Sequence, residues 1–141
     1  MIIWINKRLA LAIHSRQLAE HGGSDGVRDG GLLDAVLAEP QRLHASRPPP
    51  DLAVLAASLA YGLAHRRPFV DGNKRAAAVA CETFIRLNSG ELEANDVGLY
   101  PMYIGLAEGH ISEAEFAAWL HERIVPVTGN RVHERRAAYG R

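Results

Sequence analysis

The stretch "AHRRPFVDGNKRAA", residues 64–77, decides how this sequence folds and what chemistry it carries. Runs rich in alanine precede and follow it, so it is predicted to form a tight polar loop between two helices. Gly72 permits close approach to the backbone, and the free N–H groups at the start of the following helix favour an anion. Lys74 and Arg75 add positive charge at the same place. The stretch therefore predicts a loop that binds phosphate.

Three further residues of this loop have predicted roles. Asp71 would repel a phosphate, but its carboxylate suits Mg²⁺, a hard cation that often bridges a carboxylate and nucleotide phosphates. Asn73 either caps the following helix or orients the loop. Phe69 is expected to anchor the loop in the core. Together these residues predict a site for a nucleoside triphosphate with Mg²⁺.

Apolar residues at helical spacing predict an all-α protein, a compact bundle of about six helices with the loop between two central helices. Short strands are possible near residues 1–5 and 91–94. The expected helices are residues 6–21, a run from Asp29 that ends before Pro40, a central run that Asp51 caps and that extends past Leu63, residues 73–88, roughly 96–108, and a last helix that opens with the capping box of Ser112 and Glu115.

Composition narrows the class of protein. The chain has 141 residues, which suggests one domain. It carries 16 basic and 16 acidic side chains, and this zero net charge argues against a general nucleic-acid binder. The single cysteine, Cys81, excludes an intramolecular disulfide and fits a reducing compartment. The N-terminus lacks a signal-peptide pattern, and no apolar run is long enough to span a bilayer. A cytoplasmic protein without membrane association is expected.

The end of the chain differs from the rest. Residues 1–125 are predicted to form the domain, and residues 126–141, "PVTGNRVHERRAAYGR", form a basic tail. The tail is either a solvated terminus or a segment that packs on a partner.

The string "PFVDGNKR" resembles the signature of the Fic/Doc family, whose pattern runs His-x-Phe-x-Asp/Glu-Gly-Asn-Gly/Lys-Arg. The likeness extends over about residues 3–125. "AEHGGSDGVRDGGLLDAVLAEPQ" (residues 19–41), "AASLAYGLA", "RLNSGEL" and "GHISEAEFAAWL" resemble the death-on-curing branch, the toxins of type II toxin–antitoxin systems. The resemblance implies the all-helical Fic fold and transfer of a group from a nucleoside triphosphate to a hydroxyl of a target protein.

Lys74 occupies the position where Fic enzymes, which transfer AMP, carry a second glycine. The death-on-curing branch has lysine there and phosphorylates elongation factor Tu, which arrests translation. The resemblance therefore implies a kinase-type toxin that uses ATP and Mg²⁺, with a cognate antitoxin and an elongation factor Tu-like target as partners. DNA contact is expected only through the antitoxin. Transfer of AMP remains the alternative activity.

The resemblance also implies roles for individual residues. Asp71 would hold the metal, Gly72 and Asn73 would form and orient the anion site, Lys74 and Arg75 would neutralise phosphates, and Phe69 would anchor the loop. The extended segment 40–50 would match the family's flap, where the target peptide docks, although its prolines limit strand-like pairing.

One position departs from the family pattern. The family's catalytic histidine, which takes the proton from the target hydroxyl, lies two residues before the phenylalanine, and here that position is Arg67. A guanidinium stays protonated, so Arg67 can bind phosphate but cannot act as a base. His65 lies two residues upstream of the required position, and neither a helix end nor an extended loop easily brings it there. The remaining histidines, His14 included, show no metal-ligand spacing and are expected at the surface or an interface.

Two explanations for Arg67 stay open. In the first, arginine was introduced to inactivate a toxin that would kill its expression host, and the otherwise intact site favours this explanation. In the second, the chain is a natural pseudo-enzyme. Accordingly, the chain is either an inactive copy of a toxin kinase or a module that binds nucleotide or antitoxin without catalysis. A DNA-binding helical domain is disfavoured by the zero net charge and the absence of a recognition-helix pattern.

Overall fold

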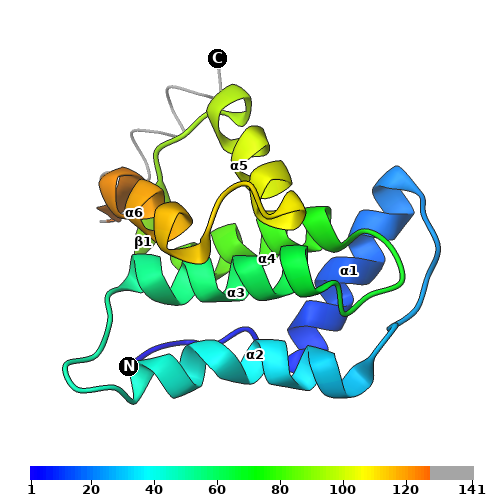
Figure 1. Ribbon diagram of the computed structural model, residues 1–141, viewed down its shortest axis with the longest axis horizontal. Coiled ribbons are helices and arrows are strands. Elements are labelled where there is room, and N and C mark those ends of the chain that lie inside the picture. Colours follow the sequence, from blue (N-terminus) through cyan, green and yellow to red (C-terminus); the bar gives the residue numbers. More distant parts are fainter. Residues whose placement is uncertain (128–141) are drawn as a thin grey trace.

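The computed structural model describes residues 1–127, which form a bundle of helices with one small pair of strands (Figure 1). This confirms the predicted all-α bundle of about six helices. The elements are α1 (Lys7–His21), α2 (Gly30–His44), α3 (Leu52–Arg66), α4 (Asn73–Leu87), β1 (Gly90–Leu92), α5 (Asp96–Glu108), α6 (Glu113–Arg123) and β2 (Ile124–Pro126).

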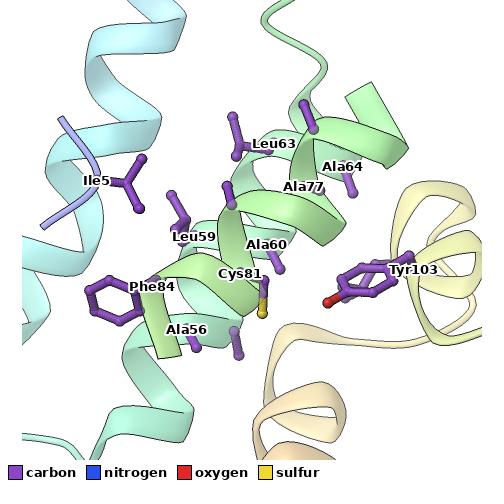
Figure 2. Packing of buried hydrophobic residues seen from close by; sticks show 14 of the residues in the cluster. Ile5, Ala56, Leu59, Ala60, Leu63, Ala64, Ala77, Cys81, Phe84 and Tyr103 are labelled. Carbon is purple, nitrogen blue, oxygen red and sulfur yellow. The ribbon is translucent and has the colours of Figure 1, made fainter. Parts of the chain in front are cut away.

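Helix α3 lies at the centre of the bundle and packs against α2, α4, α5 and α6. Its alanines recur every four residues at Ala56, Ala60 and Ala64, and all three are buried. Figure 2 shows them beside Ala77 and Cys81 of α4. Side chains this small let the two helix backbones approach closely, so the ends of α3 and α4 that flank the loop are held firmly together.

Most helices begin at a side chain that accepts a hydrogen bond from the first turn, as the sequence predicts at Asp29, Asp51 and Ser112. Asn6 and Asn95 act in the same way for α1 and α5. Among the helices within residues 1–127, only α4 has no side-chain cap, because its N-cap residue is a glycine. The N–H groups of its first turn are therefore available to another partner.

Helix α2 corrects one sequence prediction. It does not end before Pro40 but continues through this residue to His44. Proline removes one helical hydrogen bond. The added turn is stabilised by burial of Pro40 itself and by Leu43, which packs against the core.

The two strands correct a second sequence prediction, which placed possible short strands near residues 1–5 and 91–94. Residues 1–5 form no strand, whereas β1 overlaps the predicted segment 91–94 and pairs antiparallel with β2, Glu91 opposite Val125. The N–H of Val127 also donates to the carbonyl of Ser89, 2.9 Å away. The beginning of the predicted basic tail is thus paired with β1, and the rest of that tail lies outside the described residues. No helix described here has the length and apolar character needed to cross a membrane.

The loop between α3 and α4 and the connection between α1 and α2, residues 22–29, lie together at one end of the bundle (Figure 1). The connection between α2 and α3 lies at the other end of α3, a helix of 15 residues that is roughly 22 Å long at 1.5 Å per residue. The predicted flap role for residues 40–50 is therefore wrong in position, because the length of α3 separates most of that segment from the loop.

Candidate functional site

The loop that joins α3 to α4, residues 67–72 and called the motif loop below, pairs with the connection between α1 and α2. Val27 and Phe69 form an antiparallel bridge, and the N–H of Val70 donates to the carbonyl of Gly26, 3.0 Å away. The N–H groups of Arg28 and Asp29 donate to the carbonyl of Pro68 at 2.8 and 3.1 Å. Residues 22–29, rather than 40–50, are therefore the extended segment beside this loop.

Asn73 orients the motif loop. Its Oδ1 accepts from the N–H of Phe69 at 3.0 Å, and its Nδ2 donates to the carbonyl of the same residue at 3.1 Å. The N-cap of α4 is instead Gly72, with φ 74° and ψ 17°. This left-handed conformation is one that glycine adopts at little cost. Of the two roles that the sequence leaves open for Asn73, the structure therefore shows loop orientation.

The carboxylate of Asp71 accepts two backbone hydrogen bonds. Oδ2 accepts from the N–H of Ser24 at 3.1 Å, and Oδ1 accepts from the N–H of Gly72 at 2.8 Å. These two bonds, that from Ser24 first, hold the pKa of Asp71 below its usual value, and the positive charge of Arg75 acts in the same direction. Asp71 is exposed and ionised at neutral pH, and each oxygen keeps a lone pair for a further ligand.

A cavity of about 280 Å³ opens at the start of α4. Asp71, Gly72 and Asn73 line it together with three cationic side chains, and α5 closes one side with Tyr100, which is 55% exposed. Phe69 is not part of this wall, because it is 1% exposed and lies in the core. The full lining is Ala64, Arg67, Val70, Asp71, Gly72, Asn73, Lys74, Arg75, Tyr100 and Ala107. All the predicted polar site residues therefore meet in one cavity.

Arg67 ends α3 in the left-handed conformation, with φ 55°. Such a backbone is unusual for a residue other than glycine. The guanidinium of Arg28 holds it in place, because Nε donates to the carbonyl of Arg67 at 2.7 Å and Nη2 donates to that of Arg66 at 2.8 Å. Arg67 is one of the residues that line the cavity. A permanent cation at this point can bind phosphate but cannot remove a proton.

His65 does not contribute to the cavity wall. Its Nδ1 lies 3.2 Å from the carbonyl oxygen of Leu106 in α5, and its ring stacks on Tyr61 with the centroids 5.0 Å apart. These two contacts hold the imidazole against α3 and α5. The geometry therefore gives His65 no place as a base for a reaction in the cavity.

The expectation that His14 lies at the surface or at an interface is wrong, because this residue of α1 is buried inside the bundle. It is 2% exposed, and its ring lies flat on Phe69, with centroids 3.8 Å apart and planes at 4°. Its Nε2 is 2.8 Å from the carbonyl oxygen of Asp71. Sequence reasoning missed this residue and Arg28. A signal for His14 was present, since it lies four residues before Leu18, on the face of α1 expected to point inward.

The described residues contain no cluster of three or more His, Cys, Asp or Glu side chains that could hold a metal by themselves. Asp71 is a single carboxylate next to a cavity lined by cations. Mg²⁺ is often held by one or two carboxylates, with nucleotide phosphates and water as its other ligands. The donor set thus fits a metal ion that arrives with a nucleotide and does not fit a metal site built from protein ligands alone.

The sequence of the chain is similar to sequences of known proteins. The sequence model of the Fic/DOC family matches residues 4–85, more than half of the chain. The chain belongs to the Fic/DOC family. The matched region holds α1, α2, α3 and nearly all of α4, and hence the whole motif loop. Tyr100 and the rest of α5 lie outside it.

Two curated relatives are similar to this Fic/DOC chain. "Toxin Doc" of Mycolicibacterium smegmatis is 44% identical over 75 residues, which cover 52% of this chain and 58% of that protein. "Protein kinase doc" of Escherichia phage P1 is 28% identical over 107 residues, which cover 76% of this chain and 84% of the phage protein. The chain thus spans little more than half the length of the first relative and most of the second.

Proposed function

We propose that the cavity at the start of α4 binds ATP with Mg²⁺, and that the chain is the toxin of a toxin–antitoxin module. The observation that carries this proposal is the uncapped N-terminus of α4, which opens on a cavity with Arg67, Lys74 and Arg75 in its wall. Free N–H groups, the helix dipole and formal positive charges all favour phosphate. The names of the relatives, "Toxin Doc" and "Protein kinase doc", support the same function.

Asp71 is the residue proposed to hold Mg²⁺. Its carboxylate is ionised and exposed, and two backbone N–H groups fix its position at the cavity. When bound, Mg²⁺ would offset negative charge on the phosphates. Gly72 leaves room for phosphate oxygens close to the backbone, and Lys74 and Arg75 are the side chains proposed to neutralise them.

Tyr100 is proposed to stack on the nucleotide base. It is the aromatic side chain that borders the cavity, and more than half of its surface is exposed. If the phosphates of the nucleotide lie at the start of α4, its base can contact the ring of Tyr100 on the α5 side of the cavity. Stacking on an aromatic side chain is a common way to hold a base.

The transfer reaction proposed for this fold moves phosphate from ATP to a hydroxyl of an elongation factor Tu-like translation factor. Lys74 favours the kinase over the AMP transferase, because an added cation beside the phosphates changes how a triphosphate is oriented. Residues 22–29, which run beside the motif loop, are the proposed place for the target segment. A cognate antitoxin is the second proposed partner, and copurification of the chain with the product of an adjacent small gene would support it.

Arg67 favours a second candidate for the chain as it stands. With arginine where the base would be, the site can bind nucleotide but has no group to accept the proton of a target hydroxyl. The chain then acts as a non-catalytic protein that binds nucleotide or antitoxin. Both candidates share the same cavity and differ in whether phosphate is transferred.

Restoring the base separates the two candidates. The Arg67→His variant is incubated with Mg²⁺, elongation factor Tu and ATP labelled at either the α- or the γ-phosphate. We expect γ-label on the target with Arg67→His and none with the unmodified chain or with Arg67→His combined with Asp71→Ala. Label from the α-phosphate would identify an AMP transferase. No label with any variant, and normal growth of cells that express Arg67→His, would leave the non-catalytic candidate.

A further inference from the structure

His14 lies beneath the motif loop, outside the cavity itself. Apart from Tyr103 and Cys81, it is one of two buried side chains with a polar group in the part of the chain that the structure describes, the other being Ser58. The carbonyl oxygen of Asp71, 2.8 Å from its Nε2, can only accept a hydrogen bond. Nε2 therefore carries the proton and donates it to the loop.

We propose that His14 is a positioning residue that fixes the orientation of the peptide unit between Asp71 and Gly72. This inference rests on the proposed nucleotide site. In a trans peptide the C=O and the N–H point in opposite directions. Because the carbonyl points to His14, the N–H of Gly72 points away from α1, where it lies 2.8 Å from Oδ1 of Asp71. The hydrogen bond from His14 thus also fixes the position of the Gly72 N–H, and through it the orientation of the Asp71 carboxylate that is proposed to hold Mg²⁺.

The peptide unit needs such a restraint because Gly72 follows it. Gly72 has φ 74°, and glycine adopts positive and negative φ about equally well. A flipped peptide would turn the carbonyl dipole toward the Asp71 carboxylate and the proposed phosphates, and the N–H toward α1. It would also leave the buried imidazole N–H without a partner, which is costly. Asn73 does not supply this restraint, since its bonds go to Phe69.

The stack on Phe69 explains why the imidazole points in one direction. The two rings are almost parallel, with planes at 4°, and Phe69 is fixed in the core. Leu18, one helical turn further along α1, has its Cδ2 3.4 Å from where a Cβ on Gly72 would lie. The ring therefore has little freedom to rotate or to withdraw, and its N–H stays directed at the loop.

Three variants of His14 distinguish the effect of its N–H donor from the effect of its stacked ring. His14→Gln places an amide donor near the position of Nε2, His14→Asn places its donor closer to α1, and His14→Phe keeps the stack without a donor. The first readout is the amide resonance of Gly72 and its hydrogen exchange by NMR. The second is the Kd of Mg²⁺–ATP for the chain with Arg67 unchanged, measured by calorimetry. The control is Ile13→Val, a core substitution on the same helix that leaves the donor in place.

We expect His14→Phe and His14→Asn to shift the Gly72 amide resonance, speed its exchange and weaken Mg²⁺–ATP about tenfold, because the peptide unit can then flip and only the unflipped form is competent to bind. His14→Gln should keep the resonance near its original position and the Kd within about threefold. If His14→Phe does not fold, the contrast between Asn and Gln decides.

An unchanged Gly72 amide in the variants without a suitably placed donor would overturn the proposal, whether or not nucleotide binds. Equal losses of Mg²⁺–ATP affinity in all His14 variants and in Ile13→Val would also overturn the proposal, because such losses would reflect lost packing alone. If the unmodified chain does not bind Mg²⁺–ATP, the proposed function fails, and the amide measurements still decide the role of His14.

Discussion

The side chain of Asn73 forms two hydrogen bonds with the backbone of Phe69, one to its N–H and one to its carbonyl, at 3.0 and 3.1 Å. These bonds connect the first turn of α4 to the residue that anchors the motif loop in the core. A side chain four residues away therefore closes the loop without using the backbone of Gly72, whose N–H donates to Oδ1 of Asp71 at 2.8 Å.

Asn73→Ala should lower the free energy of unfolding by about 1–3 kcal/mol, because both polar groups of Phe69 lose their partner. Asn73→Asp should also destabilise the protein, since it keeps an acceptor for the N–H but places a second carboxylate oxygen, which cannot donate, opposite the carbonyl oxygen of Phe69. Urea unfolding at neutral pH measures both variants. An alanine variant as stable as the unmodified protein would show that water satisfies these groups equally well.

The hydrogen bonds at Asp71 predict a dependence of stability on pH. Its pKa is lower in the folded protein than in the unfolded chain, where it is about 3.9. The ionised carboxylate therefore adds stability above pH 4, and this contribution is lost as the pH falls through the folded-state value. We expect the difference in unfolding free energy between the unmodified protein and Asp71→Asn to be greatest near pH 7 and to shrink below pH 4. A difference that stays constant from pH 7 to pH 2.5 would contradict the prediction.

The fold was largely predictable because its signals are local. Helical spacing and capping residues such as Asp51 and Ser112 act within a few residues, and the structure places caps at both. The errors arise where distant contacts decide. Helix α2 continues past Pro40 because Leu43 packs on the core, and β1 pairs with a segment more than thirty residues further along the chain. Neither of these contacts can be predicted from the local sequence pattern.

The candidate site was predictable only in part, for the same reason. The polar site residues all lie within the short stretch 67–75, so the sequence alone predicts that they are close together. His14 lies 57 residues before Asp71, and only the fold shows that they touch. The proline-rich segment 40–50 has the composition of an exposed, extended chain, but the length and direction of α3 decide which end of the bundle it occupies.

Cys81 should be unreactive in the native protein. It is fully buried between α3 and α4, and burial raises the pKa of its thiol to about 12. The reactive thiolate is therefore absent at pH 8, and reagents cannot reach the sulfur. A chromogenic disulfide reagent should detect no thiol in the native protein and one in urea. Rapid reaction of the native protein, absent in a Cys81→Ala control, would contradict this packing.

Two glycines of α5 should respond in opposite ways to alanine. A Cβ on Gly105 would lie 2.5 Å from Cδ1 and 2.7 Å from Cγ1 of Ile111, closer than packed carbons approach. Gly105→Ala should therefore destabilise the protein by about 1–3 kcal/mol. A Cβ on Gly98 would meet only Oδ1 of Asn95, at 3.5 Å. Gly98→Ala should stabilise by up to about 1 kcal/mol, because alanine favours the helix. Thermal unfolding of both variants provides the comparison, and equal effects would refute it.

Tyr100 provides the test of how the base is held. If its ring stacks on the base, Tyr100→Ala should weaken Mg²⁺–ATP binding about tenfold, within the range measured for base stacking, and Tyr100→Phe should keep the affinity within about threefold. Val97→Ala is the matched control, since Val97 is 84% exposed on the same helix and does not line the cavity. Binding of Mg²⁺–tripolyphosphate, which has no base, should be the same in all these variants. A loss of tripolyphosphate binding in Tyr100→Ala would instead show that Tyr100 shapes the phosphate site, and the base would then lie elsewhere.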